Sequence, residues 1–373
     1  MSTLGYDQEF VGLAAPGGHR AGAGGWPCQG IYYTPSGKRP KVAMIATHYN
    51  VDFSQHYLAD YIARRGIGFL GWNTRFRGAE QYFLLDHALV DIGVGVRWLK
   101  EVAGVETVIL LGNSGGGSLM SAYQSQAVEP NAAPAFGMKA AVGVEDLIAG
   151  DGYVALAAHP GRPDVLTSWM DAAVLDEFDP TLTDPELDLW NPDNGPPYSA
   201  EFVARYREAQ VARNQRITDW CKSELERITA EGFVDRVFPL SRTWADPRMV
   251  DPTLDPSGRP ANLCYGGVPQ RANRSVWGIG VANTLRTWLS MWSLETSQCR
   301  GEPHLARVTV PALVISADAD VGVFPSDATR IADAIASNDK SLHSLPGAHY
   351  FEAPEGARDT VADLVVEWIG THW

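Results

Sequence analysis

Ser114 stands among glycines in residues 110–120, which read LLGNSGGGSLM and directly follow an apolar run. A phosphate-gripping loop would need GxxxxGK[ST] or GxGxxG, and neither pattern is present. What remains is a G-x-S-x-G over residues 112–116. Between a strand and a helix, such a turn exposes the serine hydroxyl as a nucleophile and sets the Gly115 N–H at a helix N-terminus, where developing negative charge is favoured. The alternative is a glycine turn without chemistry.

The elements around this turn alternate between short apolar runs and helical patterns. We expect strands over residues 41–50, 67–78, 105–112, 138–146, 308–316 and 342–345. We expect helices over residues 56–66, 89–99, 116–128, 327–335 and 361–369. This alternation predicts an α/β protein with a doubly wound, mostly parallel sheet that helices cover on both faces.

The strand, G-x-S-x-G turn and helix together resemble the nucleophile elbow of the α/β-hydrolase superfamily, in its serine-nucleophile, esterase- and lipase-like branch. The resemblance extends over about residues 40–146 and 306–373. It implies a core made of residues 1–146 and 306–373. Residues 147–305 are then a helical, Trp-rich cap domain inserted after the sixth strand. Its longest helix is predicted over about residues 200–228.

A serine hydroxyl needs a base and a group that orients the base. The superfamily orders these residues as serine, acid and histidine along the chain. His349, in LPGAHYF before the final helix, resembles the family's catalytic histidine. Asp320, in SADADVGVFP after a strand, resembles its acid, and Asp318 is the alternative, otherwise a turn residue. We therefore predict a Ser114–Asp320–His349 triad.

An oxyanion hole is also expected, because acyl transfer creates a negatively charged oxygen. The Gly115 N–H is the first predicted donor. By resemblance to the family's His-Gly-X loop, the second comes from His48-Tyr49-Asn50, where Tyr49 replaces the glycine. We expect the backbone N–H of Asn50 to be this donor, with Tyr49 as the alternative. His48 is interpreted mainly as a residue that pins the loop.

The substrate pocket is expected under the cap, where most of the chain's 12 tryptophans lie. Many of them serve as filler for a small cap core, but ligand pockets are also lined by aromatic residues. We predict that Trp169, Trp277 and Trp288 line the pocket together with His48. For Arg162, a salt bridge at the surface or between domains is the first interpretation, and contact with a substrate carboxylate is the second.

Composition limits the partners of the protein. The formal net charge is −14 and the pI is about 5.1, which argues against nucleic acid or anionic membranes as partners. No signal peptide or membrane-spanning run is visible, and the 4 cysteines lie far apart without CxxC pairing. We therefore expect a cytoplasmic protein without membrane insertion. No metal site is apparent, and the predicted chemistry needs no cofactor. Homo-oligomer formation stays open.

The predicted function is a serine hydrolase that cleaves a carboxylic ester or lactone of an apolar or aromatic small molecule through an acyl-enzyme. The same triad also serves cleavage of thioesters, amides and C–C bonds, and catalytic residues alone do not separate these reactions. Epoxide and haloalkane chemistry is disfavoured, because those branches of the superfamily carry aspartate at the position of Ser114. A non-catalytic binding protein of the same fold is the alternative from another class.

Overall fold

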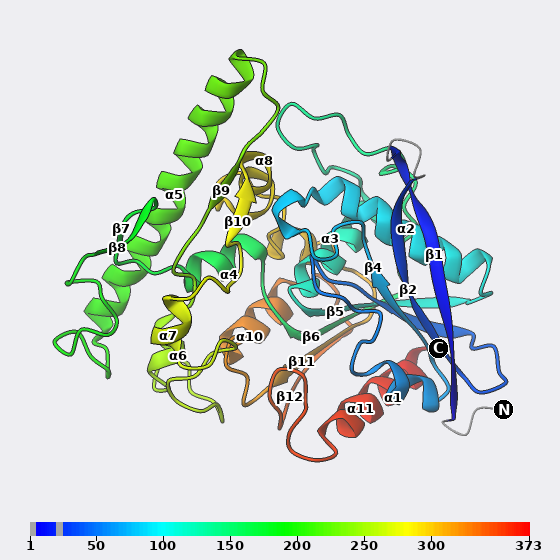
Figure 1. The fold of residues 1–373 in the computed structure, drawn as a ribbon. Coiled ribbons are helices and arrows are strands. Elements are labelled where there is room, and N and C mark those ends of the chain that lie inside the picture. Colours follow the sequence, from blue (N-terminus) through cyan, green and yellow to red (C-terminus); the bar gives the residue numbers. More distant parts are fainter. Residues whose placement is uncertain (1–4, 20–24) are drawn as a thin grey trace.

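The structure is a computed structural model that describes residues 5–19 and 25–373 (Figure 1). The strands of its main sheet are β1 (Tyr6–His19), β2 (Gly25–Pro35), β3 (Val42–Ala46), β4 (Gly68–Asn73), β5 (Thr107–Ser114), β6 (Gly152–Ala158), β11 (Ala312–Ala317) and β12 (Lys340–Leu345). In the described residues they form an eight-stranded sheet in the order β1-β2-β4-β3-β5-β6-β11-β12. The strands from β4 to β12 in this order pair in parallel, so the predicted mostly parallel sheet is confirmed.

Helices cover both faces of this sheet (Figure 1). They are α1 (Ala59–Arg64), α2 (Leu85–Glu101), α3 (Gly116–Val128), α10 (Pro325–Ala334) and α11 (Ala357–His372). Strand β5 shows why both faces are covered, because its residues alternate between two hydrophobic cores. Val108 and Leu110 join the core with α2 and α3, whereas Ile109 and Leu111 join the core with α1 and α11. A strand buried on both faces reads as a continuous apolar run, which is how the sequence reads here.

The sheet begins with an antiparallel hairpin of β1 and β2, for which the sequence patterns gave no prediction. Its register runs from Tyr6 opposite Pro35 to Ala14 opposite Pro27, and β2 also pairs antiparallel with β4. The hairpin therefore extends the parallel sheet at the edge far from Ser114.

One predicted strand is wrong. Residues 138–146 lie in turns and irregular backbone, where Gly143 has a left-handed φ of 91°. The strand beside β5 is instead β6, the fully buried run GYVALAA, which falls within the stretch expected to be cap. A short apolar run is insufficient evidence for a strand, because the same composition occurs here in a surface loop, where Met138 and Val142 are exposed. The core of the fold therefore continues to Ala158.

Residues 161–305, here called the inserted segment, leave the sheet after β6 and return before β11 (Figure 1). Its elements are α4 (Arg162–Trp169), β7 (Val174–Asp176), β8 (Asp179–Thr183), α5 (Ala200–Ala230), β9 (Val237–Pro239), α6 (Pro247–Val250), α7 (Pro269–Asn273), β10 (Ala282–Thr284), α8 (Leu285–Thr287), the π-helical turn η2 (Trp288–Trp292) and α9 (Glu302–Leu305). The long helix was predicted correctly, and the Ser199 hydroxyl caps it by accepting from the Phe202 N–H at 3.1 Å.

Candidate active site

The chain turns sharply at Ser114, the last residue of β5, just before the first turn of α3. Ser114 has a left-handed φ of 56°, a conformation that costs energy for a residue with a Cβ atom. The turn also requires residues without a side chain on either side of Ser114. A Cβ on Gly112 would lie 2.6 Å from the Gly117 Cα, and one on Gly116 would lie 2.3 Å from the Thr47 carbonyl oxygen. The predicted strand–turn–helix around this serine is therefore present.

His349 and Asp320 lie on the loops that follow the adjacent strands β12 and β11. The His349 Nδ1 lies 2.6 Å from Asp320 Oδ2, and both side chains are buried. Asp318, the alternative acid, accepts instead from the Gly347 N–H at 3.1 Å, as a turn residue does. The structure thus pairs His349 with Asp320.

Asp320 also fixes which nitrogen of His349 carries the proton. An ionised carboxylate only accepts hydrogen bonds, so the proton of the imidazole lies on Nδ1 and the lone pair on Nε2. The Nε2 atom is buried and has no hydrogen-bond partner among the described residues. It therefore presents an unused acceptor, as a general base requires.

Tyr265 of the inserted segment completes this pair. Its hydroxyl donates to Asp320 Oδ1 at 2.6 Å and lies 2.8 Å from His349 Nδ1. Burial and the Asp320 charge raise the pKa of Tyr265 well above its ordinary value, so the phenol keeps its proton. A Cβ on Gly322 would lie 2.6 Å from the Tyr265 ring, so this glycine makes room for the tyrosine.

The hydrogen bonds keep Asp320 ionised. Burial alone would raise the pKa of Asp320, but His349 and the donors around the carboxylate outweigh it and hold the pKa below its usual value. Besides Tyr265, these donors include the backbone N–H groups of Gly322 and Val323, at 2.9 and 3.0 Å from Oδ1. Asp320 is therefore a stable anion behind the imidazole.

Ser114 and His349 line one cavity of about 670 Å³ between the carboxyl ends of the strands and the inserted segment. His48, Asn50, Phe53, Glu80 and Arg162 line it from the sheet side and from the start of α4. Tyr265, Leu263 and Ile279 line it from the inserted segment. The volume suits a small organic molecule.

Three tryptophans form the aromatic side of this cavity. Trp169 stacks on Trp244 with ring centroids 4.9 Å apart, and Trp244 stacks on Trp277 at 5.1 Å. The predicted Trp169 and Trp277 thus lie in the lining, and Trp244 joins them. The prediction for Trp288 is wrong, because its indole is buried in the core and donates to the Thr218 hydroxyl of α5 at 3.1 Å.

The loop after β3 differs from the predicted oxyanion hole. The Asn50 N–H, the expected donor, points to His48 Nδ1 at 3.3 Å, and the Val51 N–H points to the same atom at 3.2 Å. The Tyr49 side chain turns into the core, where its hydroxyl lies 3.0 Å from Ser118 Oγ. His48 does hold the loop, as expected, and its ring also lines the cavity.

Known proteins resemble this chain in fold but not detectably in sequence. No family model matches the sequence, and no curated protein matches it significantly. Solved structures match almost the whole chain. The α/β hydrolase GrgF from Penicillium sp. sh18 has 13% sequence identity and a TM-score of 0.54, with 98% of this chain and 99% of GrgF covered. DcsB, solved with its substrate analogue, has 14% identity and a TM-score of 0.53, with coverage of 98% and 100%. This chain has the α/β-hydrolase fold.

Within this α/β-hydrolase fold, Arg162 lies inside the protein rather than at its surface. Its guanidinium pairs with Glu80 and lies over the rings of Tyr49 and Trp292, with its Cζ 4.8 and 4.4 Å from their centroids. The salt-bridge interpretation of Arg162 therefore holds, but Arg162 is buried, Glu80 is half-buried, and both line the cavity.

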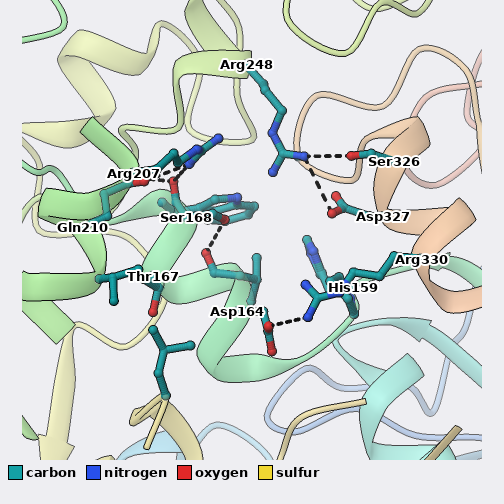
Figure 2. Close-up of a pocket in the computed structure, with 16 residues that line it drawn as sticks. His159, Asp164, Thr167, Ser168, Arg207, Gln210, Arg248, Ser326, Asp327 and Arg330 are labelled. Atoms are coloured by element: carbon teal, nitrogen blue, oxygen red, sulfur yellow. Dashed lines mark hydrogen bonds and ion pairs between the residues drawn. The ribbon is translucent and has the colours of Figure 1, made fainter. Parts of the chain in front are cut away.

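A second cavity of about 430 Å³ adjoins the first beyond His159, Val165 and Trp169 (Figure 2). Its arginine side chains are paired with other residues of the lining. Arg330 binds Asp164 at 2.8 Å, and Arg248 lies 3.3 Å from the Ser326 hydroxyl and 3.7 Å from Asp327. Because these cations already have acidic or hydroxyl partners, the cavity that holds Ser114 is the better candidate for chemistry.

Over residues 5–19 and 25–373, no group of three or more His, Cys, Asp and Glu side chains is arranged to hold a metal ion. In the same ranges, no helix is both long and apolar enough to cross a lipid bilayer.

Some site residues carried no signal in the sequence. Tyr265 lies in irregular backbone of the inserted segment, and Glu80 begins a short 3-10 helix over Glu80–Tyr82. No role at the site was predicted for either residue, and both line the cavity only in the folded chain. Their partners lie 55 and 82 positions away. Spacing along the sequence does not reveal contacts of this range.

Proposed function

We propose that this protein is a serine hydrolase that cleaves a carboxylic ester or lactone of an apolar or aromatic small molecule through an acyl-enzyme. Ser114 is the nucleophile, His349 the general base and acid, and Asp320 the residue that orients the imidazole. One observation carries the proposal: the unpartnered Nε2 of His349, whose tautomer Asp320 sets, faces the cavity that Ser114 lines.

The reaction follows from these positions. The Ser114 Oγ attacks the carbonyl carbon while His349 Nε2 takes the hydroxyl proton, and Asp320 stabilises the resulting imidazolium. The tetrahedral intermediate collapses when His349 gives the proton to the leaving alcohol oxygen. Water then attacks the acyl-enzyme by the same route and releases the acid. The Gly115 N–H stabilises the negative oxygen in both halves of the reaction.

The cavity supports an apolar substrate of moderate size. Its volume of about 670 Å³ lies in the range of small-molecule sites, and three tryptophans supply broad apolar walls. Residues 161–305 act as the cap that provides these walls, with the boundary after β6 rather than at residue 147. Similarity to α/β hydrolases such as GrgF supports the fold-level part of the proposal.

A fluorophosphonate probe tests the nucleophile. We expect the wild-type protein to be labelled stoichiometrically and Ser114→Ala to remain unlabelled, because phosphonylation needs an activated serine. Ser168→Ala is the matched control, since Ser168 lines the neighbouring cavity and donates to the Val165 carbonyl at 2.9 Å. This variant should label like the wild type.

Two outcomes would contradict the proposal. Absence of wild-type labelling would favour a binding protein of the same fold. The second outcome is a labelled protein that turns over acyl-CoA or a vinylogous diketone but not p-nitrophenyl esters. This result would retain Ser114 as the nucleophile, but the reaction would be thioester or C–C cleavage instead of ester hydrolysis.

A further inference from the structure

The imidazole of His48 has one nitrogen occupied and one nitrogen free. Its Nδ1 faces the N–H groups of Asn50 and Val51 at 3.3 and 3.2 Å, so Nδ1 is an acceptor. Burial and the neighbouring Arg162 hold the pKa of His48 well below its ordinary value, so the ring is neutral. A neutral imidazole that accepts at Nδ1 carries its proton on Nε2. Nε2 is therefore an N–H donor.

This donor lies over the elbow. A Cβ atom on Gly115 would lie 2.8 Å from His48 Nε2 and 2.9 Å from Arg162 Nη1. Both nitrogens thus lie above the Cα of the residue whose N–H is the first oxyanion donor. Neither nitrogen has a hydrogen-bond partner within residues 5–19 and 25–373, and both side chains line the cavity of Ser114.

The expected backbone donor is turned away from this point. The Asn50 N–H is directed to the His48 ring, and the Gly78 N–H holds the Asn50 carbonyl at 2.8 Å. The loop is thus fixed at both sides of this residue, and it offers the cavity an imidazole N–H in place of a peptide N–H.

We propose that the side-chain Nε2–H of His48 is the second oxyanion donor, together with the backbone N–H of Gly115. The inference rests on the proposed function, because an oxyanion forms only if Ser114 attacks a carbonyl group. Burial and the Arg162 guanidinium keep the imidazole neutral, and the guanidinium adds positive potential at the same point. Glycine at position 115 is required because a larger residue would occupy the space where the three groups meet.

His48→Asn is the most informative variant. The Asn side-chain oxygen reaches the position of Nδ1 and retains the hydrogen bonds to the loop, but it places no donor at the position of Nε2. His48→Gln has the reverse property and places an amide N–H near the Nε2 position. His56→Asn is the matched control. His56 is also buried, accepts from the Leu58 N–H at Nδ1, and bonds Asn113 through Nε2 at 3.2 Å, away from the cavity.

The readouts are kcat and KM for p-nitrophenyl butyrate, and inhibition by an alkyl trifluoromethyl ketone and its methyl ketone analogue. The fluorinated ketone forms a tetrahedral oxyanion on the serine, and we use the methyl ketone as the trigonal comparison. For His48→Asn we expect kcat to fall about 10²–10³-fold with KM nearly unchanged. Inhibition by the trifluoromethyl ketone should weaken by a similar factor, and inhibition by the methyl ketone should not. His48→Gln should recover part of kcat, and His56→Asn should leave the ratio of the two inhibition constants unchanged.

Equal weakening of both ketones in His48→Asn would show that His48 only shapes the cavity, and would overturn the inference. An unchanged kcat in His48→Asn would also overturn the inference. The backbone N–H of Tyr49 or Asn50 would then be the second oxyanion donor. Should His48→Asn fail to fold, the inhibitor ratio in His48→Gln decides: a ratio near that of the wild type supports the donor. Fluorophosphonate labelling of each folded variant separates this result from failure of the proposed function, which would remove labelling from the wild type.

Discussion

Two buried polar clusters in this molecule differ in one respect. In the inserted segment, Asp171 accepts from Arg242 at 2.7 Å and from Asn273 at 2.6 Å, and Arg213 donates to both oxygens of Glu177 at 2.8 and 2.6 Å. At the carboxyl ends of the strands, His349 Nε2 has no partner among the described residues. Buried polar groups normally satisfy one another. We infer that the fully hydrogen-bonded cluster around Asp171 stabilises the inserted segment. The cluster that contains His349 keeps a free acceptor beside the cavity, where it is available for chemistry.

The largest effect should come from removing the proposed nucleophile, Ser114. Ser114→Ala should lower kcat/KM for p-nitrophenyl esters by at least about 10⁴-fold, because the triad acts as a unit. The free energy of unfolding in urea should change by no more than about 0.5 kcal/mol, because no fold-stabilising bond is lost. Steady-state kinetics and urea unfolding on the same preparation measure both. A variant that loses several kcal/mol of stability would break the distinction between the two clusters.

The satisfied cluster should respond in the opposite way. Asp171→Asn leaves the Arg242 charge buried without its counter-charge, so the free energy of unfolding should fall by about 3–5 kcal/mol. The kcat of the folded fraction should stay near wild type. Glu231→Gln, which removes an exposed partner of Arg227, is the control and should leave stability within experimental error. A stable Asp171→Asn with impaired kcat would show that this cluster contributes to chemistry.

Acid should destabilise the protein through buried neutral histidines. Burial lowers the pKa of His56 to about 3 and that of His159 to about 3. Between about pH 6.5 and pH 3 the unfolded chain binds a proton at each of these residues and the folded chain does not, so stability falls as pH falls. Each such histidine contributes a slope of up to about 1.4 kcal/mol per pH unit. The free energy of unfolding, measured with urea from pH 7 to pH 4, should therefore fall less steeply with decreasing pH in His56→Asn than in the wild type. An unchanged slope would contradict the neutral state of His56.

The smallest effect is expected at Tyr265, which belongs to the inserted segment but bonds to Asp320 of the proposed triad. Tyr265→Phe removes one of three donors to Asp320 Oδ1, so kcat/KM should fall about two- to tenfold. Most of this fall should appear in kcat, because the Tyr265 hydroxyl bonds to Asp320 and lies beside His349 Nδ1. Steady-state kinetics on p-nitrophenyl esters measure kcat and KM separately. A fall confined to KM would reduce Tyr265 to a residue that shapes the cavity.

Most of the parallel sheet could be predicted because its signals are local, and the order of the site residues followed from the resemblance to the α/β-hydrolase superfamily. Strand β5 and the glycines of the elbow lie within ten positions of Ser114, and a sharp strand-to-helix turn constrains those residue types. Asp320 and His349 also follow recognisable strands. Their pairing across 29 positions follows from the adjacency of β11 and β12 in a parallel sheet.

The remainder depended on packing that no local pattern encodes. Residues 138–146 have the composition of a strand but lie outside the sheet, while β6 occupies the place beside β5. Trp288 and Trp277 are the same residue type in the same segment, yet the first is buried against α5 and the second lines the cavity. Which side a tryptophan faces depends on elements distant in sequence.

The backbone of Ser114 has a consequence for how variants of this protein would respond to selection. At the φ of 56° that Ser114 has, a residue with a Cβ atom is about 1–2 kcal/mol less stable than glycine. Glycine adopts this left-handed conformation without a steric penalty. Glycine at position 114 would therefore stabilise the folded protein but remove the Ser114 hydroxyl. Libraries enriched for heat tolerance alone should accumulate inactive chains at this position, so such a screen needs a catalytic readout alongside it.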